Sequence, residues 1–96
     1  INNNLKLYIM HGVLKLNVTV LVFAELKKRL KSDKIILSTE LPISVAHLLD
    51  IFGTLRPEIR DLISSCSVAL NGQMVDKKFL VYPNDEIALL PPVSGG

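Results

Sequence analysis

The most distinctive chemistry in this sequence lies in its last six residues, Pro91-Pro92-Val93-Ser94-Gly95-Gly96. Two consecutive prolines fix φ and favour an extended path. The two glycines carry no side chain, so they can enter a narrow channel and adopt backbone angles closed to other residues. We therefore expect residues 91–96 to form a projecting arm of at most about 20 Å.

The α-carboxylate of Gly96 is the reactive group of this arm. It is ionised at neutral pH and is a poor acyl electrophile in that form. It becomes reactive only when one oxygen is converted into a leaving group, as in an acyl-adenylate made from ATP. A frayed polar terminus is the competing interpretation, but it gives no reason for two prolines after a strand or for a final glycine pair.

The other reactive side chains are isolated from one another. Cys66 is the only cysteine and has no CxxC partner, so we expect a small buried residue at the entrance of a strand. His11 and His47 have no nearby acidic or cysteine pattern that would make a metal site or a triad. No carboxylate pair or glycine-rich phosphate loop is present. The sequence therefore predicts no self-sufficient enzyme, no metal and no permanently bound cofactor.

Length and composition bound the class of protein. The 96 residues, 49% of them hydrophobic, predict one small globular domain. A formal net charge of +2 and the absence of Trp argue against nucleic-acid binding. The apolar run Leu16–Ala24 is too short to cross a membrane and lacks the cleavage pattern of a secretory signal. We therefore expect no membrane association and a cytoplasmic location.

The chain divides into three segments. Residues 1–15 show no clear period and begin with Ile1, with Met10 as a candidate internal start, so they are a leader or extension of uncertain origin. Residues 16–90 form the folded domain, and residues 91–96 form the extended tail. Within the domain, four segments have the composition of strands, and the first, rich in β-branched residues, is predicted to be a central strand: Leu16–Phe23, Lys34–Ser38, Ser67–Leu70 and Glu86–Leu90.

Helices and turns connect these strands. Ala24–Lys31 reads as a short helix that buries Leu26 and Leu30. A longer helix begins after Ser44, which can cap it, and we expect Gly53 to end it in the left-handed C′ position. Pro57 opens a further short turn. The apolar stripe of the longer helix consists of Val45, Leu48, Leu49 and Phe52.

The order of these elements predicts the fold. Asn71-Gly72 supplies the positive φ angles of a tight hairpin that returns through Gln73–Val75. One main helix among several strands is typical of an α+β domain with a mixed sheet. We expect the first and last strands to lie side by side and parallel, which is the β-grasp arrangement.

Four segments of the sequence together resemble the small subunit of molybdopterin synthase, the MoaD-type sulfur carrier, which has the ubiquitin-like β-grasp fold. The resemblance covers roughly Leu16 to Gly96 and rests chiefly on the PPVSGG ending. Positions 89 and 90 are Leu, where some relatives carry aromatic residues. The four segments are NDEIALLPPVSGG, VLVFAELKK, SVAHLLDIF and ALNGQMV.

The resemblance implies a cycle of activation and transfer at Gly96. An ATP-dependent adenylating and sulfurating enzyme activates the carboxylate, and a sulfur donor displaces AMP to leave a thiocarboxylate. The carrier then docks on the large catalytic subunit of molybdopterin synthase and inserts its tail. The sulfur goes to a cyclic pyranopterin phosphate, building the dithiolene of the molybdenum cofactor. The carrier is thus a non-catalytic subunit, and the family's active complex is a heterotetramer.

The resemblance also implies a surface that contacts the large subunit. In relatives this contact is an apolar patch on the sheet beside the tail. The matching positions here are Phe23, Met74 and Leu90, with Lys27 on the rim. The competing interpretation places Phe23 and Leu90 in the core. The basic run Lys27, Lys28, Arg29 and Lys31 is by default a solvated face.

Three other functions remain open from the sequence. The chain can be a sulfur carrier for another pathway, such as thiamine synthesis or tRNA thiolation, although PPVSGG argues against this. It can be a ubiquitin-like modifier that forms isopeptide bonds with lysines, since that role needs the same tail and the same adenylation. It can be a non-catalytic interaction domain whose glycine pair has no chemical role.

Overall fold

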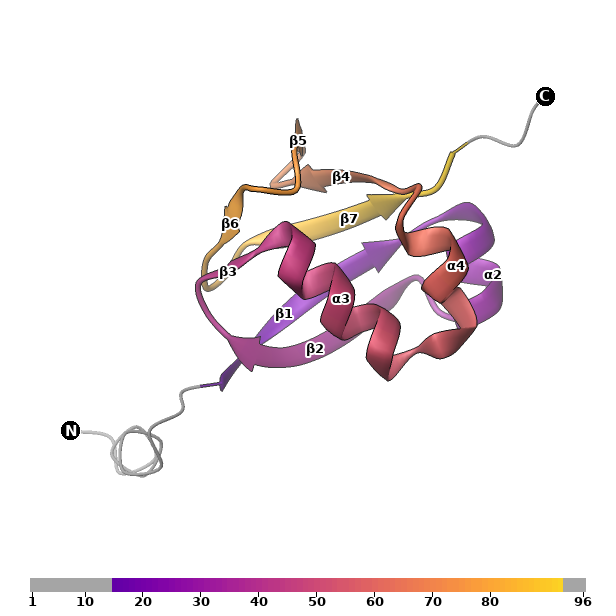
Figure 1. Cartoon of the computed structure of the whole chain (residues 1–96), viewed down its shortest axis with the longest axis horizontal. Helices are drawn as coiled ribbons and strands as arrows, with labels where there is room; N and C mark the ends of the chain where they lie inside the picture. The colour runs from indigo at the N-terminus through magenta and orange to yellow at the C-terminus, as the bar shows by residue number, and fades with distance from the viewer. Residues whose placement is uncertain (1–14, 93–96) are drawn as a thin grey trace.

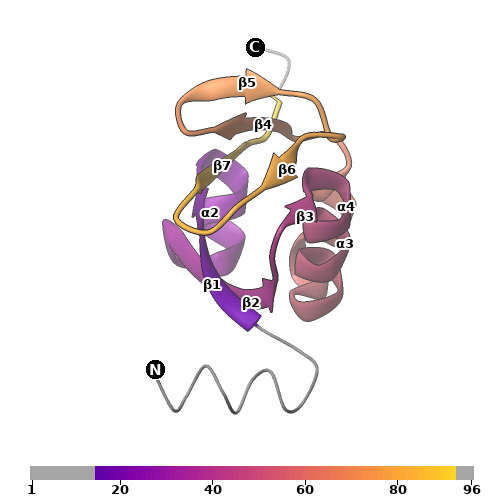
Figure 2. The ribbon, with the colours of Figure 1, turned by 90° about the vertical axis from the view of Figure 1, so that its left-hand side faces the viewer.

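A computed structural model describes residues 15–92 of the chain, so the predicted leader and Val93–Gly96 lie outside it apart from Lys15 (Figure 1). A five-stranded sheet in the order β2-β1-β7-β4-β5 forms one layer. Helix α3 (Val45–Leu55) packs across one face of this sheet (Figure 2), which confirms the predicted mixed α+β fold. The strands are β1 (Lys15–Val22), β2 (Lys34–Glu40), β4 (Ser67–Leu70), β5 (Gln73–Val75) and β7 (Glu86–Leu90).

Strand β1 lies inside the sheet because both of its edges are paired. It runs antiparallel to β2 and parallel to β7, and Val20 pairs with Ile35 on one side and Ile87 on the other. The predicted parallel pairing of the first and last strands is confirmed. Val18 and Val22 are buried beneath α3, as the alternation of a strand requires.

Helix α3 (Val45–Leu55) supplies the second layer of the core. The Ser44 hydroxyl accepts a hydrogen bond from the His47 backbone N–H at 3.1 Å, so the predicted N-cap is confirmed. The predicted end at Gly53 is wrong, because the helix continues to Leu55 and the Arg56 N–H bonds back to the Phe52 carbonyl. Gly53 is buried against α4 (Arg60–Ile63), and a side chain at this position would contact Ile63. All four residues of the predicted stripe are buried: Val45, Leu48, Leu49 and Phe52.

Three short helical segments frame one end of the sheet (Figure 1). Helix α2 (Ala24–Leu30) follows β1 directly and buries Leu26 and Leu30, as predicted. The 3-10 helix η1 (Pro57–Ile59) opens at the proline and continues into α4 (Arg60–Ile63). These segments lie where β1 and β7 end, at the opposite end of the sheet from Lys15.

A tight turn and a second, smaller sheet complete the fold. Asn71 and Gly72 have φ of 50° and 84°, so the predicted hairpin turn between β4 and β5 is confirmed. A two-stranded sheet of β3 (Ile43–Ser44) and β6 (Leu80–Val81) was not expected from the sequence. It ties the start of α3 to the chain that leads into β7, and the Phe79 carbonyl accepts from the Val45 N–H at 2.9 Å.

Candidate functional site

Strand β7 forms the base of the C-terminal tail. It is hydrogen-bonded on both sides, parallel to β1 and antiparallel to β4. Ile87 and Leu89 are both fully buried, so alternate side chains anchor the strand in the core. Pro91, half-buried, and Pro92, exposed, follow the strand without a turn. The chain therefore passes from the interior of the sheet directly into Pro91 and Pro92. The rest of the predicted arm, residues 93–96 with the reactive Gly96, lies outside the described residues.

The face of the sheet opposite α3 is open and partly apolar. Leu21 pairs with Ala88, Ala88 with Ala69, and Ala69 with Met74, so these four residues form one row across four strands. Paired residues point to the same face of a sheet. Together with Phe23 and Leu90, which lie two positions further along their strands, this row is called the apolar strip below.

Phe23 and Leu90 lie together at the tail end of the apolar strip. Val22 pairs with Leu89, and Phe23 keeps extended backbone angles, so the next step of the register sets Phe23 beside Leu90. Phe23 is 43% exposed, and Leu90 is half-buried. Neither belongs to the buried core, so the competing interpretation of these two residues as core is wrong.

The two other predicted contact residues lie further from the tail. Met74 is 61% exposed on the same open face, two strands away from β7. That separation is about 10 Å across the sheet. Lys27 lies on α2, one turn after Phe23, whose carbonyl accepts its backbone N–H at 3.4 Å. The structure therefore groups Phe23, Leu90 and Lys27 around the tail base and places Met74 at the far end of the strip.

Ala69 and Ala88 are residues of this surface that the sequence analysis missed. Both are half-buried and provide a flat floor between Leu21 and Met74. Both alanines could have been found from the alternation of side chains along β4 and β7. Val68, Ile87 and Leu89 point into the core, so the residues next to them must point to the open face. A small side chain between larger apolar ones leaves room for a partner's side chain, and we had not expected either alanine to matter.

An unusual backbone conformation fixes Phe23 on this surface. Ala24 has φ of 52°, in the left-handed region that non-glycine residues rarely adopt. It turns the chain from β1 into α2 within one residue. The Phe23 carbonyl accepts from the Leu26 N–H at 3.1 Å, which caps the helix without any help from a side chain.

Arg29 holds α2 against the segment that contains η1 and α4. Its Nη1 donates to Asp61 Oδ1 at 2.7 Å and to the Glu58 carbonyl at 3.1 Å. Its Nε lies 3.4 Å from Glu25 Oε2. The hydrogen bond to Asp61 raises the pKa of the Arg29 guanidinium, and the bond to Glu25 adds to it. The basic run thus contains one structural arginine, while Lys27, Lys28 and Lys31 are exposed as predicted.

The remaining reactive side chains lie away from the tail or take no part in a cluster. Cys66 is buried just before β4, as predicted for a small residue at the entrance of a strand. This burial raises the pKa of its thiol. His47 is exposed on α3, and His11 lies outside the described residues. Within residues 15–92, no three His, Cys, Asp or Glu side chains lie close enough to hold a metal ion. No helix of this part is long and apolar enough to cross a membrane.

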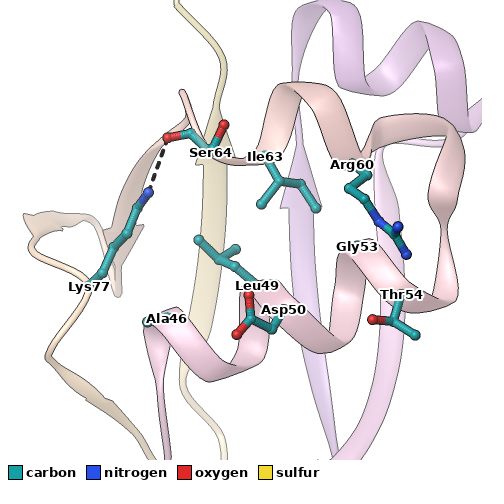
Figure 3. A pocket seen from close by; sticks show the side chains of 9 residues that line it. All are labelled: Ala46, Leu49, Asp50, Gly53, Thr54, Arg60, Ile63, Ser64 and Lys77. Atoms are coloured by element: carbon teal, nitrogen blue, oxygen red, sulfur yellow. Dashed lines mark hydrogen bonds between the residues drawn. The ribbon is translucent and has the colours of Figure 1, made fainter.

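A groove lies on the helical side of the molecule (Figure 3). It has a volume of about 450 Å³ between α3, α4 and the loop after β5. Lys77 reaches across its rim and donates to the Ser64 carbonyl at 3.2 Å. The groove lies on the opposite side of the sheet from the apolar strip, so it is not part of the tail site.

Comparison with known proteins identifies the family of this chain. A model of the ThiS family matches residues 20–96. A molybdopterin synthase sulfur carrier subunit of Aspergillus niger is 33% identical over 57% of this chain and 68% of its own length. Its counterpart in Dictyostelium discoideum is 30% identical over 80% of this chain and 93% of its own length. The chain therefore belongs to the ThiS family, and the resemblance to these carriers is confirmed.

Solved structures confirm the fold. The solution structure of the small archaeal modifier protein 1 from Methanosarcina acetivorans has a TM-score of 0.71 at 26% identity, over 86% of this chain and 99% of its own. Subunits 1 and 2 of the molybdopterin-converting factor from Helicobacter pylori form a solved complex. Its match has a TM-score of 0.60 at 23% identity, over 84% of this chain and 100% of that chain. The ubiquitin-like β-grasp fold predicted from the sequence is thus confirmed.

Proposed function

We propose that this chain is the sulfur-carrier subunit of a molybdopterin synthase. The observation that carries the proposal is the course of β7, which leaves the sheet centre directly as Pro91-Pro92 beside an exposed apolar strip. A partner that covers the strip receives the tail at the same time. The identity to curated carriers of that name supports the same role.

The tail delivers sulfur in four steps. An adenylating enzyme transfers AMP from ATP to the Gly96 carboxylate and releases pyrophosphate. A sulfur donor then attacks the acyl carbon, AMP leaves, and a thiocarboxylate remains. On the large subunit, the thiocarboxylate sulfur bonds to a carbon of the pterin precursor as an oxygen leaving group departs. Water then cleaves the acyl C–S bond, which leaves the sulfur on the pterin and returns the Gly96 carboxylate. Because the sulfur is tethered to a docked protein, its delivery is effectively intramolecular. ATP is consumed by the activating enzyme and is no cofactor of the carrier.

The apolar strip serves as the docking surface for the large subunit. Phe23 and Leu90 flank the tail base, and the exposed thioether of Met74 suits an adaptable contact. Lys27 adds a charge at the rim, where it affects association rate more than affinity. The solved complex of subunits 1 and 2 of a molybdopterin-converting factor supports a partner of this kind.

Intact mass spectrometry tests the sulfur-carrier role directly. The full chain is incubated with ATP, a carrier-activating enzyme and a sulfide source. A mass gain equal to the exchange of one oxygen for one sulfur at Gly96 is the expected result. A chain lacking Gly95 and Gly96 is the matched control and should gain nothing. No gain by the full chain, with an enzyme that activates a known carrier, would contradict the proposal.

A Leu90→Asp variant tests the docking surface separately. Because Leu90 lies outside the core, we expect the variant to fold and to lose binding to the large subunit. Thr54→Asp, at an exposed position on α3, is the control and should bind normally. Unfolding of the Leu90 variant, or binding unchanged from the wild type, would remove Leu90 from the proposed surface.

A protein-modifier role is the second candidate. The match to a small archaeal modifier protein is the observation that favours it. Both roles need adenylation of Gly96, so they differ only in the acceptor. Cell extracts in which Gly96 is linked to lysine amines would support the modifier role, and a thiocarboxylate without such links would support sulfur transfer alone. We propose a cytoplasmic location for either role.

A further inference from the structure

Strand β2 is an edge strand with free backbone groups on its outer side. The Val22 N–H donates to the Asp33 carbonyl at 3.0 Å, which makes that position a hydrogen-bonded pair of the β1–β2 ladder. Such pairs recur at every second residue, so Ile35, Leu37 and Thr39 direct their backbone groups towards β1. The residues between them therefore face outward: Lys34, Ile36, Ser38 and Glu40.

The contacts of the outward residues agree with this assignment. The Ser32 hydroxyl accepts from the Lys34 N–H at 3.3 Å and donates to the Lys34 carbonyl at 2.8 Å, on the outer side of β2. Within residues 15–92, the outward N–H and C=O groups of Ile36, Ser38 and Glu40 have no protein partner. Ser32 thus closes one end of an edge that stays open along the other three residues.

The length of β2 and its exposed apolar residue favour pairing with another strand, because this edge is not protected against it. Proteins protect edges with very short strands, and β5, at the other edge of the sheet, has only three residues. Strand β2 has seven, and its Ile36 side chain is 53% exposed. An edge this long with an apolar residue at its middle is a template for another strand.

The sequence of β2 is complementary to itself in one antiparallel register. When two copies pair about Leu37, Lys34 lies opposite Glu40 of the second copy and Ile36 lies opposite Ser38 of the second copy. Ile36 and Ser38, whose outward backbone groups are free, then exchange backbone hydrogen bonds across the axis. Lys34, whose outward backbone groups are held by Ser32, contributes its side chain. Two Lys–Glu pairs form at the ends of the new ladder. Neither Lys34 nor Glu40 takes part in an ion pair among the described residues.

The same register places a groove of each copy beside the new ladder, on the helical side of the sheet. A groove of about 550 Å³ runs between β2 and α3, lined among others by Thr39, Ile51 and Leu55. Leu55 is 57% exposed at the end of α3. Pairing about a two-fold axis perpendicular to the sheet brings both α3 helices to the same side. Each groove lies at the Thr39 end of its own β2, so the axis at Leu37 places the two grooves diagonally across the new ladder.

We propose that β2 pairs with β2 of a second copy of this chain, joining two sheets into one. The charges at Lys34 and Glu40 select this register, because a shift by two residues removes both opposite-charge pairs. The base of the tail stays free in the dimer, since β7 lies inside the sheet and most of the apolar strip lies towards β5. The proposal does not depend on sulfur transfer.

Sedimentation equilibrium of the full chain from micromolar to millimolar concentration tests the pairing. We expect a monomer–dimer equilibrium. Lys34→Glu and Glu40→Lys should each weaken dimerisation about tenfold, because each turns two attractive cross-strand pairs into repulsive ones. The double variant Lys34→Glu/Glu40→Lys should restore the dimer. An equimolar mixture of the two single variants should form heterodimers, because every cross-strand charge pair is then attractive.

Two further variants separate the edge from general charge effects. Ile36→Pro removes an outward N–H that the fold does not use, so we expect a folded monomer with unchanged circular dichroism. Lys78→Glu makes the same charge change at an exposed position outside β2 and should leave the dimer intact. A monomer throughout, or a dimer that survives Ile36→Pro in a folded protein, overturns the proposal. If the chain is a monomer, an extended segment of another protein becomes the alternative partner of the β2 edge.

Discussion

The two faces of the central sheet use the same strands for different purposes. On the α3 side, Val20, Val22, Ile87 and Leu89 are almost fully buried in one core. On the other side, Leu21, Ala88 and Leu90 alternate with them and are only half-buried. Along β7, side chains that stabilise the core therefore alternate with side chains of the proposed docking surface. The effect of a substitution on stability therefore depends more on which face of the sheet the residue lies on than on its residue type.

Leu89 and Leu90 give the most direct test of this difference. Leu89→Ala removes a fully buried side chain and should lower the free energy of unfolding by about 2–5 kcal/mol. Leu90→Ala makes the same chemical change on the open face and should lower it by less than about 1 kcal/mol. Urea titration of both variants measures the two effects. Equal losses would mean that the open face contributes to the fold as the core does.

Removal of the α3 cap should weaken the core side by a smaller amount. Ser44→Ala leaves the His47 N–H without its acceptor and should cost about 1 kcal/mol of unfolding free energy. Binding of the large subunit should be unaffected at temperatures where the variant is folded, since α3 lies on the other face. Ser64→Ala is the comparison, because it removes an exposed hydroxyl that makes no hydrogen bond to the described residues. A loss of binding in the folded Ser44 variant would contradict this expectation, because it would mean that a change at α3 alters the opposite face of the sheet.

Acid should have the smallest effect, and only on the helical side. The Glu58 backbone N–H and the Arg56 guanidinium, 3.2 Å from Glu58 Oε2, lower the pKa of Glu58 below its ordinary 4.5. A lowered folded-state pKa contributes stability above the unfolded pKa, and that stability is lost as the pH falls through the folded value. Glu58→Gln should therefore flatten the acid side of a stability profile slightly, as measured by urea titration at several pH values. A flattening near neutral pH would assign the effect to another group.

Most of the sheet could be predicted from the sequence because its signals are local. The β-branched run of β1 and the Asn71-Gly72 turn each specify their structure within a few residues. The β3–β6 pair was missed because two-residue strands carry no period and form only when α3 and the loop before β7 are in place. Gly53 was misread as a helix end because a glycine's local preference gave way to burial against Ile63.

The candidate site could be predicted in its residue types more than in its geometry. Phe23 and Leu90 were expected on one surface with Met74, but the sequence could not say that Met74 lies two strands further away. The contact between Arg29 and Asp61 joins residues far apart in sequence, so no local pattern announces it. The positive φ of Ala24 depends on the packing of α2 and was equally invisible.

The central position of β7 also determines how the molecule responds to force. Any pull on Pro91 is directed along β7, whose hydrogen bonds to β1 and β4 lie across that direction. The bonds of both ladders are therefore strained together in shear, whereas bonds at a sheet edge pulled sideways would open one after another. A force applied to the tail along β7 is thus resisted by both ladders at once, and the domain should stay folded at loads that would peel away an edge strand.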